Sequence, residues 1–212
     1  MRAAYRIEFD EAKHVYTVDG VQVPSVTEIL TPITARHYGA ISKETLAYAA
    51  ERGTAIHEAC ESIDYGFPAE LPAEWAAYAE AYKLFLADYR PEWFGIEQMI
   101  YSGEGRYCGT VDRYGTVEGE LAVVDIKTTT SPTRENYQSG FAQTVAYGQA
   151  VAEWTGGEKP KKGYLLYLKK DGKYRLVDRD EWSEKHHFDA EKAWRLCLSL
   201  YDVTERSENG GI

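Results

Sequence analysis

The sequence has few cysteines, no long apolar run and no motif of several large enzyme classes. Its three cysteines, Cys60, Cys108 and Cys197, cannot form a four-cysteine zinc or iron–sulfur site. Their scatter indicates a reducing compartment, so we expect a cytoplasmic protein. No stretch reaches the roughly eighteen apolar residues of a membrane span, and residues 1–8 lack a secretory signal. A G-x-S-x-G turn, a P-loop, G-x-G-x-x-G and H-E-x-x-H are also missing.

Positive charge is scarce as well. The net charge of −10 argues against indiscriminate binding of nucleic acid. The basic residues are nevertheless concentrated, with seven of them in residues 155–175. Such a stripe, including Lys161 and Lys162, could follow a phosphate backbone. A solvated hairpin carrying lysines is the alternative interpretation, and composition alone favours it.

Length and periodicity predict one α/β domain with a mixed central β-sheet flanked by helices. A hydrophobic content of 44% in 212 residues suffices for a continuous core. We expect an N-terminal β-hairpin and helical part at 1–92, a catalytic core at 93–203 and a flexible tail at 204–212. The expected strands are 5–9, 14–18, 94–101, 163–169 and 173–177, and the expected helices are 25–28, 42–65, 72–89, 134–154 and 181–203.

Residues 106–127 form the most informative segment, because they predict a two-stranded hairpin. Glu118 and Gly119 suit a two-residue turn between runs rich in Val, Thr and Tyr. With this turn, Val117 pairs with Glu120. A bulge at the nearby Gly115 would shift the register by one residue.

The same register puts Asp112 opposite Asp125, where two carboxylates repel each other. Lys127 shares the face of Asp125, because side chains in a strand alternate. Two facing carboxylates suit a hard cation such as Mg²⁺ or Mn²⁺, with the carbonyl of Ile126 as a third ligand. Lys127 could then orient an attacking water. The alternative is an ordinary Asp–Lys pair at a strand end.

Further polar residues are candidates for the same site. His57 shares a helix face with Gly53 and could bind the cation, although a core histidine is the alternative. Gln143 and Tyr147 share another helix face and could bind a phosphate or a water, although a polar seam of an amphipathic helix explains them equally well. Glu97 could be an outer carboxylate or a paired surface residue.

The order of these motifs resembles the PD-(D/E)XK nucleases, and more narrowly their RecB-type branch, which includes phage exonucleases. The similarity runs from about Arg52 to Ala150. It implies that His57, Asp112, Asp125 and the Ile126 carbonyl bind the metal and that Lys127 acts on the attacking water. The motifs that carry it are Gly53…His57, Gly109-Thr-Val-Asp112, Asp125-Ile-Lys127 and Gln143…Tyr147.

The resemblance implies a metal-dependent DNA exonuclease that serves phage or bacterial recombination or repair in a bacterial host cell. Gln143 and Tyr147 would position the water or the DNA, and Arg52, Thr128, Lys161 and Lys162 are the further candidates for binding DNA. Several relatives carry an iron–sulfur cluster, which three scattered cysteines exclude here. A homo-oligomer or a recombination partner is compatible with this interpretation. An acidic, non-catalytic DNA mimic or docking protein and a structure-selective endonuclease are the alternatives.

Overall fold

The computed structural model describes residues 5–10, 13, 15–38, 42–129 and 131–206. The first residue of the expected strand 14–18 and residues 207–212 of the expected tail therefore lie outside the described residues. Within the described part of the chain, no helix is both long and apolar enough to cross a bilayer.

The central sheet has five strands in the order β4-β5-β6-β7-β8. β6 and β7 run parallel and the other neighbours run antiparallel, so the sheet is mixed, as predicted. Parallel neighbours need a crossover connection, which the helix α5 provides. The strands are β4 (Glu92–Ser102), β5 (Tyr107–Val117), β6 (Glu120–Lys127), β7 (Lys162–Leu168) and β8 (Tyr174–Asp178).

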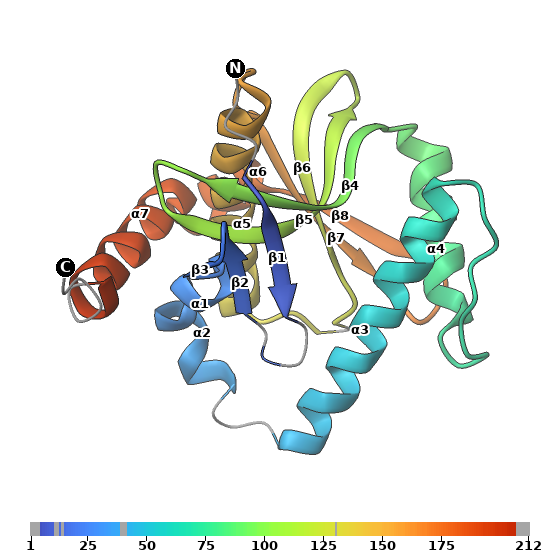
Figure 1. Ribbon diagram of the computed structural model, residues 1–212. Coiled ribbons are helices and arrows are strands. Elements are labelled where there is room, and N and C mark those ends of the chain that lie inside the picture. The colour runs from blue at the N-terminus through green and yellow to red at the C-terminus, as the bar shows by residue number, and fades with distance from the viewer. Residues whose placement is uncertain (1–4, 11–12, 14, 39–41, 130, 207–212) are drawn as a thin grey trace.

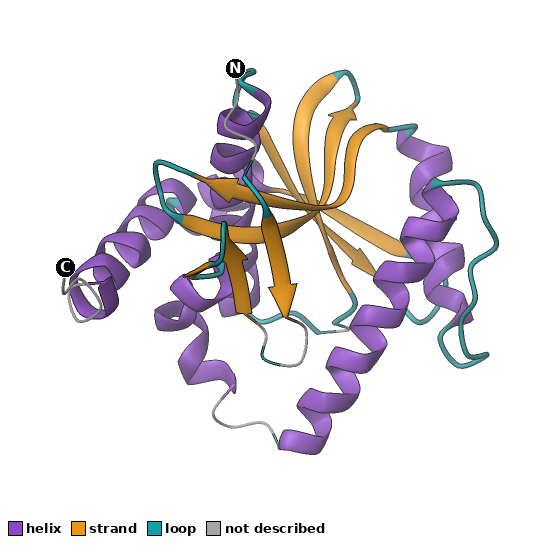
Figure 2. Cartoon of the chain, in the orientation of Figure 1, coloured by secondary structure: helices purple, strands orange, loops and turns teal. Residues whose placement is uncertain are grey.

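Helices cover both faces of this sheet (Figures 1 and 2). On one face, α3 (Lys43–Asp64) and α4 (Ala76–Tyr89) pack over a core that includes Val124 and Leu166. On the other face, α5 (Arg134–Thr155) packs over Val123 and Leu165. This arrangement explains why β6 and β7 are almost continuously apolar. The domain is therefore the single α/β unit that the sequence predicts.

A small antiparallel sheet precedes this domain core and packs on β4 and β5. It consists of β1 (Ile7–Asp10), β2 (Val15–Val18) and β3 (Val21–Val23). Tyr16 and Val18 share a core cluster with Cys108, and the hydroxyls of Tyr16 and Thr110 lie 3.0 Å apart. The helices α1 (Val26–Ile29) and α2 (Thr31–Tyr38) follow, and a capping box of Ser25 and Glu28 begins α1, where a short helix was predicted. The strand β3 and the helix α2 were not predicted.

The prediction of one closing helix at 181–203 is wrong. The chain forms α6 (Arg179–His186) and α7 (Ala190–Tyr201), followed by one π-helical turn at Asp202–Arg206. His187 has a left-handed backbone with φ of 50°, which ends α6. The side chain of Asp189 then accepts a hydrogen bond from the Lys192 N–H and caps α7. Both signals are local, but helical periodicity continues across them.

Candidate active site

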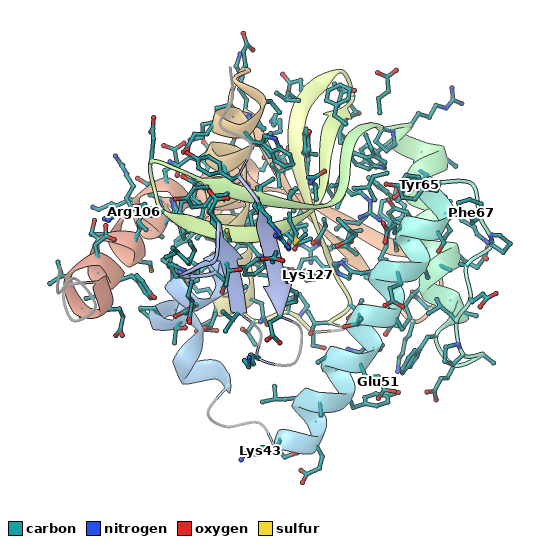
Figure 3. All side chains as sticks on the ribbon, in the orientation of Figure 1. Lys43, Glu51, Tyr65, Phe67, Arg106 and Lys127 are labelled. Carbon is teal, nitrogen blue, oxygen red and sulfur yellow. The ribbon has the colours of Figure 1, made fainter. Side chains whose placement is uncertain are left out.

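Three neighbouring strands each contribute one carboxylate to the same region of the sheet. Glu97 comes from β4, Asp112 from β5 and Asp125 from β6. Lys127 ends β6 and is labelled near the centre of the view in Figure 3. α3 contributes His57 from one face of the sheet, so segments forty residues apart along the chain meet here.

The predicted hairpin register is confirmed over most of its length. β5 and β6 pair from Val117 with Glu120 to Arg113 with Val124. The turn residues Glu118 and Gly119 have φ of 52° and 82°, which is the backbone of a type I′ turn. No bulge interrupts this ladder at Gly115, since the irregularity of the sheet lies in β4, between Trp93 and Gly95.

Asp112 lies one step beyond the last pair of this ladder. Its Oδ2 accepts a hydrogen bond of 2.6 Å from the backbone N–H of Ile126. The regular alternation of β5 also changes at this residue. Val111 packs into the core beneath α5, whereas Arg113 reaches the side of α3 and α4, although residues i and i+2 of a regular strand share a face. Asp112 therefore sits where the strand is irregular, and Asp125 is its neighbour rather than its partner in the ladder.

His57 lies among the oxygens of this group. Its Nε2 is 3.1 Å from the carbonyl oxygen of Ile126, and its Nδ1 is 3.1 Å from Oε1 of Glu97 and 3.7 Å from Oδ1 of Asp112. Ligand atoms of His57, Glu97 and Asp112 lie within 4.8 Å of one another, close enough to share one cation. Glu97, which the sequence suggested as an outer carboxylate, is thus a member of the group itself.

Asp125 heads a second set of contacts that runs toward α5. Its Oδ2 lies 2.7 Å from Nζ of Lys127, which in turn donates a hydrogen bond of 3.3 Å to Oε1 of Gln143. The amide of Gln143 donates to the hydroxyl of Tyr147 at 3.0 Å. The structure therefore brings all four of these predicted residues together. Apart from the ion pair, neither carboxylate oxygen of Asp125 accepts a hydrogen bond from the described residues, although both are buried.

Burial and neighbouring charges shift the pKa values of Asp112, Asp125 and His57. Burial raises the pKa of Asp112 to about 6, and the nearby charge of Asp125 adds to the effect. Burial likewise raises the pKa of Asp125. For His57, burial lowers the pKa, but the charges of Asp112 and Glu97 outweigh it and raise the pKa to about 9. Buried carboxylates without sufficient counter-charge fit a divalent cation, whose charge would favour their ionised forms.

A cleft of about 630 Å³ opens beside this group. Arg52 and Tyr48 line it from α3, Thr128 from the end of β6 and Gln143 from α5, and Lys127 also faces it. The guanidinium of Arg52 lies 5.9 Å from the centre of the Tyr48 ring. Of the predicted substrate-binding residues, Arg52, Thr128 and Tyr147 therefore lie in or directly behind this cleft.

The other two, Lys161 and Lys162, lie elsewhere. Lys162 begins β7 and pairs with Ala122, whereas the active end of β6, at Lys127, pairs with Tyr167. Five residues of strand separate these positions, or about 16 Å at roughly 3.3 Å per residue. Nζ of Lys162 is also 3.0 Å from Oδ2 of Asp178. Contact with DNA at these lysines would require a substrate that extends along the sheet, so their role stays a prediction.

Sequence reasoning missed a buried pair behind the group, Arg113 and Asp64. Both side chains are almost completely buried, and Nε of Arg113 lies 2.6 Å from Oδ2 of Asp64. Nη1 of Arg113 donates to Glu97 at 2.9 Å. The signal in the sequence is an arginine between Val111 and Val117 in the predicted hairpin strand, since a charged residue is almost never buried without a partner.

Comparisons with known proteins give distant structural likenesses and one family. An alkaline exonuclease (LHK-Exo) from Laribacter hongkongensis is 12% identical with a TM-score of 0.37, over 85% of this chain and 88% of that one. The same exonuclease in complex with dAMP is 12% identical with a TM-score of 0.35, over 88% and 93%. The structure of SSO0001 is 16% identical with a TM-score of 0.33, over 82% and 83%.

A search of curated proteins finds no match to the sequence. The family model that matches is that of the PD-(D/E)XK nuclease superfamily, over residues 35–199. This range includes α3, all five strands of the central sheet and every residue of the group described above. Since the match spans most of its length, the chain belongs to the PD-(D/E)XK nuclease superfamily.

Proposed function

We propose that this protein is a metal-dependent deoxyribonuclease that removes nucleotides from the ends of DNA. One observation carries the proposal: His57, Glu97 and Asp112 converge on one point, and the ion pair of Asp125 with Lys127 lies beside an open cleft. A nuclease of this superfamily uses a divalent metal ion, and a hard cation prefers such oxygen ligands. DNA as the substrate and attack from an end are our inferences from the family and from the sequence.

His57, Glu97, Asp112 and Asp125 would bind Mg²⁺ or Mn²⁺, together with the carbonyl of Ile126. The buried carboxylate of Asp125 supports this assignment, because its contact among the described residues is the ion pair with Lys127 and a buried charge needs more compensation than one partly exposed partner gives. The histidine would shift the preference toward Mn²⁺ relative to an all-oxygen site. When bound, the cation offsets the negative charge that develops on the phosphate.

Lys127 would position the attacking water. Hydrolysis forms a bond from the water oxygen to phosphorus and breaks one ester P–O bond, while the water loses a proton and the leaving oxygen gains one. Nζ of Lys127 contacts both Asp125 and Gln143, so these two side chains fix the orientation of the ammonium group. Tyr147 fixes the amide of Gln143 in turn. Such pre-positioning lowers the barrier because the reacting groups need not be ordered during the reaction.

Arg52 and Thr128 would bind the DNA strand in the cleft. Arg52 supplies a permanent positive charge for a phosphate, and Thr128 adds a hydroxyl beside Lys127. The cleft also contains further hydroxyl side chains from the surrounding helices, among them Thr27, Thr45 and Ser139. Contacts of this kind go to the DNA backbone and carry little sequence information.

The test is digestion of end-labelled linear DNA with Mg²⁺ or Mn²⁺. We expect shortening from an end that a chelator abolishes and that Asp125→Ala and Lys127→Ala remove. Lys83→Ala is the matched control, because Lys83 lies on α4 and pairs there with the exposed Glu80. Cleavage by both active-site variants at the wild-type rate would overturn the assignment.

Two alternatives give different results in the same assay. A structure-selective endonuclease would cut a circular substrate, which an exonuclease leaves intact. An acidic DNA mimic, which the net charge of −10 suggested, would cut neither substrate. The burial of Asp112 and Asp125 argues against a mimic, because a mimic has to display its carboxylates on the surface. A role in phage or bacterial recombination or repair, alone, as an oligomer or with a partner, is part of the proposal.

A further inference from the structure

Arg113 connects the candidate metal group to the core beneath α3 and α4. Its side chain is fully buried, and its Nε donates to Oδ2 of Asp64 at 2.6 Å and to the hydroxyl of Tyr82 at 3.2 Å. From the other end of the guanidinium, Nη1 donates to Oε1 of Glu97 at 2.9 Å and to the carbonyl oxygen of Asp112 at 2.6 Å. One rigid, planar side chain therefore joins two candidate ligands to the core.

Asp64 fixes the inner end of this connection. It accepts hydrogen bonds from the hydroxyl of Tyr82 at 2.8 Å and from Nε1 of Trp93 at 3.1 Å, in addition to that from Arg113. Donors from α4, β4 and β5 thus converge on one carboxylate at the end of α3. The guanidinium cannot rotate without breaking several of these bonds, so its outer end is held in place.

Glu97 needs such support because its own backbone is strained. Its φ is 43°, a left-handed conformation that is uncommon for any residue but glycine and unusual within a strand. Strain of this kind persists only where the surroundings impose it, and it concentrates at functional sites. Here it accompanies a carboxylate that meets both His57 and Arg113 through the same oxygen.

Stability alone does not account for the arginine. Its Nη2 is buried and has no hydrogen-bond partner in the described part of the chain. A buried donor without a partner is unfavourable, and a well-packed apolar pair is often as stable as a buried ion pair. What the arginine adds over an apolar residue is a fixed direction for Glu97.

We propose that Arg113 is a positioning residue: with Asp64, it holds Glu97 among the candidate ligands before a cation arrives. The cation then meets a carboxylate that is already ordered, and binding loses less conformational freedom. This inference rests on the proposed metal-dependent function. Hydrogen-bonding partners of metal ligands typically change metal affinity by about 10- to 100-fold when they are replaced.

The decisive variant replaces both members of the pair, Asp64→Asn together with Arg113→Met. This change removes one positive and one negative charge, so the net charge near the cation stays the same while the hydrogen bonds of Arg113 to Glu97, to the Asp112 carbonyl and to Tyr82 are lost. The amide oxygen that Asp64→Asn introduces would still accept hydrogen bonds from Tyr82 and Trp93. The measurement is the Kd for Mn²⁺ of the chelator-treated full chain by titration calorimetry. We expect the Kd to rise at least tenfold while the melting temperature changes little.

Controls separate a positioning role from general destabilisation. Tyr107→Phe removes a buried hydroxyl that donates to the Ala146 carbonyl, away from the group, and should leave the Kd unchanged. Arg113→Lys, with Asp64 present, keeps the charge but cannot bridge both carboxylates, so we expect an intermediate Kd. Should the double variant fail to fold, this single variant supplies the test.

The outcomes distinguish this inference from the proposed function. If Glu97→Gln weakens Mn²⁺ binding and the double variant does not, the pair is purely structural and the inference is wrong. If neither change matters but Asp112→Asn abolishes binding, Glu97 is not a ligand, and the inference fails while the nuclease proposal stands. If all of these variants bind Mn²⁺ like the wild type, the proposed metal site is wrong, and the nuclease proposal loses its cation.

Discussion

Replacing Gly109 with alanine should displace Tyr147 and with it the support of Gln143. Gly109 lies on β5, and a Cβ built there would be 2.6 Å from Cε1 of the Tyr147 ring. Ordinary contact begins near 3.4 Å, so the ring edge has to move by about 0.8 Å. Tyr147 belongs to α5, and its ring is buried in the core between this helix and the sheet, so it has little room to move.

The size of the effect follows from this displacement. Overpacking of a buried site costs about 1–3 kcal/mol. For a protein of this length, 2 kcal/mol corresponds to a fall in melting temperature of roughly 4–8 °C. The bond from Gln143 to the Tyr147 hydroxyl, now 3.0 Å, would lengthen toward the limit of a hydrogen bond. Because a misplacement of about 1 Å can lower a rate by roughly 100-fold, cleavage should fall more than stability suggests.

The assay combines a thermal melt, followed by near-ultraviolet circular dichroism, with the end-labelled digestion. Gly148→Ala is the matched control on α5, because a Cβ there meets Pro160 at an ordinary 3.7 Å. That variant should be neutral or more stable by up to about 1 kcal/mol and should cleave normally. A Gly109→Ala protein that melts and cleaves like the wild type would refute the packing argument.

Three further predictions follow from other contacts. The charges of Asp112 and Glu97 raise the pKa of His57 from 6.5 to about 9, so the metal-free protein should lose stability as the pH rises through this window. Over the same window Mn²⁺ should bind more tightly, because it binds the neutral imidazole ring. An affinity for Mn²⁺ that is independent of pH between 7 and 9 would contradict this prediction. Arg90 ends α4 in a left-handed conformation with φ of 44°, which glycine adopts without strain. Arg90→Gly should therefore stabilise the protein by about 1 kcal/mol in a thermal melt and leave DNA cleavage unchanged. Lys161→Glu with Lys162→Glu should lower the salt dependence of binding for long DNA duplexes and leave the binding of duplexes shorter than about five base pairs unaffected. The reason is that these lysines lie about 16 Å from the active end of the sheet. An equal effect on both substrates would exclude a path of the DNA along the sheet to these lysines.

Local rules predicted much of the hairpin and the helices. A two-residue turn at Glu118 and Gly119 fixes the register of its two strands, so the pairs from Val117 with Glu120 to Arg113 with Val124 followed from counting residues, and the ladder ends one step before Asp112 and Asp125. The helical spacing of Gln143 and Tyr147 likewise put both on one face of α5, where they are hydrogen-bonded. These relations depend only on backbone geometry within one element or one turn.

The same rules failed where a local signal competed with periodicity or where distant segments meet. The break between α6 and α7 depends on one left-handed residue, His187, inside an otherwise helical pattern. The charged stripe at 155–175 suggested one surface, but β7 carries Lys162 away from the cleft. The composition of a segment shows that it carries many lysines, but it does not show at which end of the sheet each lysine lies.

The sequence by itself determined the fold class, the hairpin register and the identity of Asp112, Asp125, Lys127 and His57 as candidates, because strand and helix periods act over a few residues. Only the tertiary structure decided that Glu97 joins them and that Arg113 and Asp64 stand behind it. The physical reason is that these contacts depend on the left-handed backbone of Glu97 and on packing between residues 49 positions apart in the chain, neither of which has a period to detect.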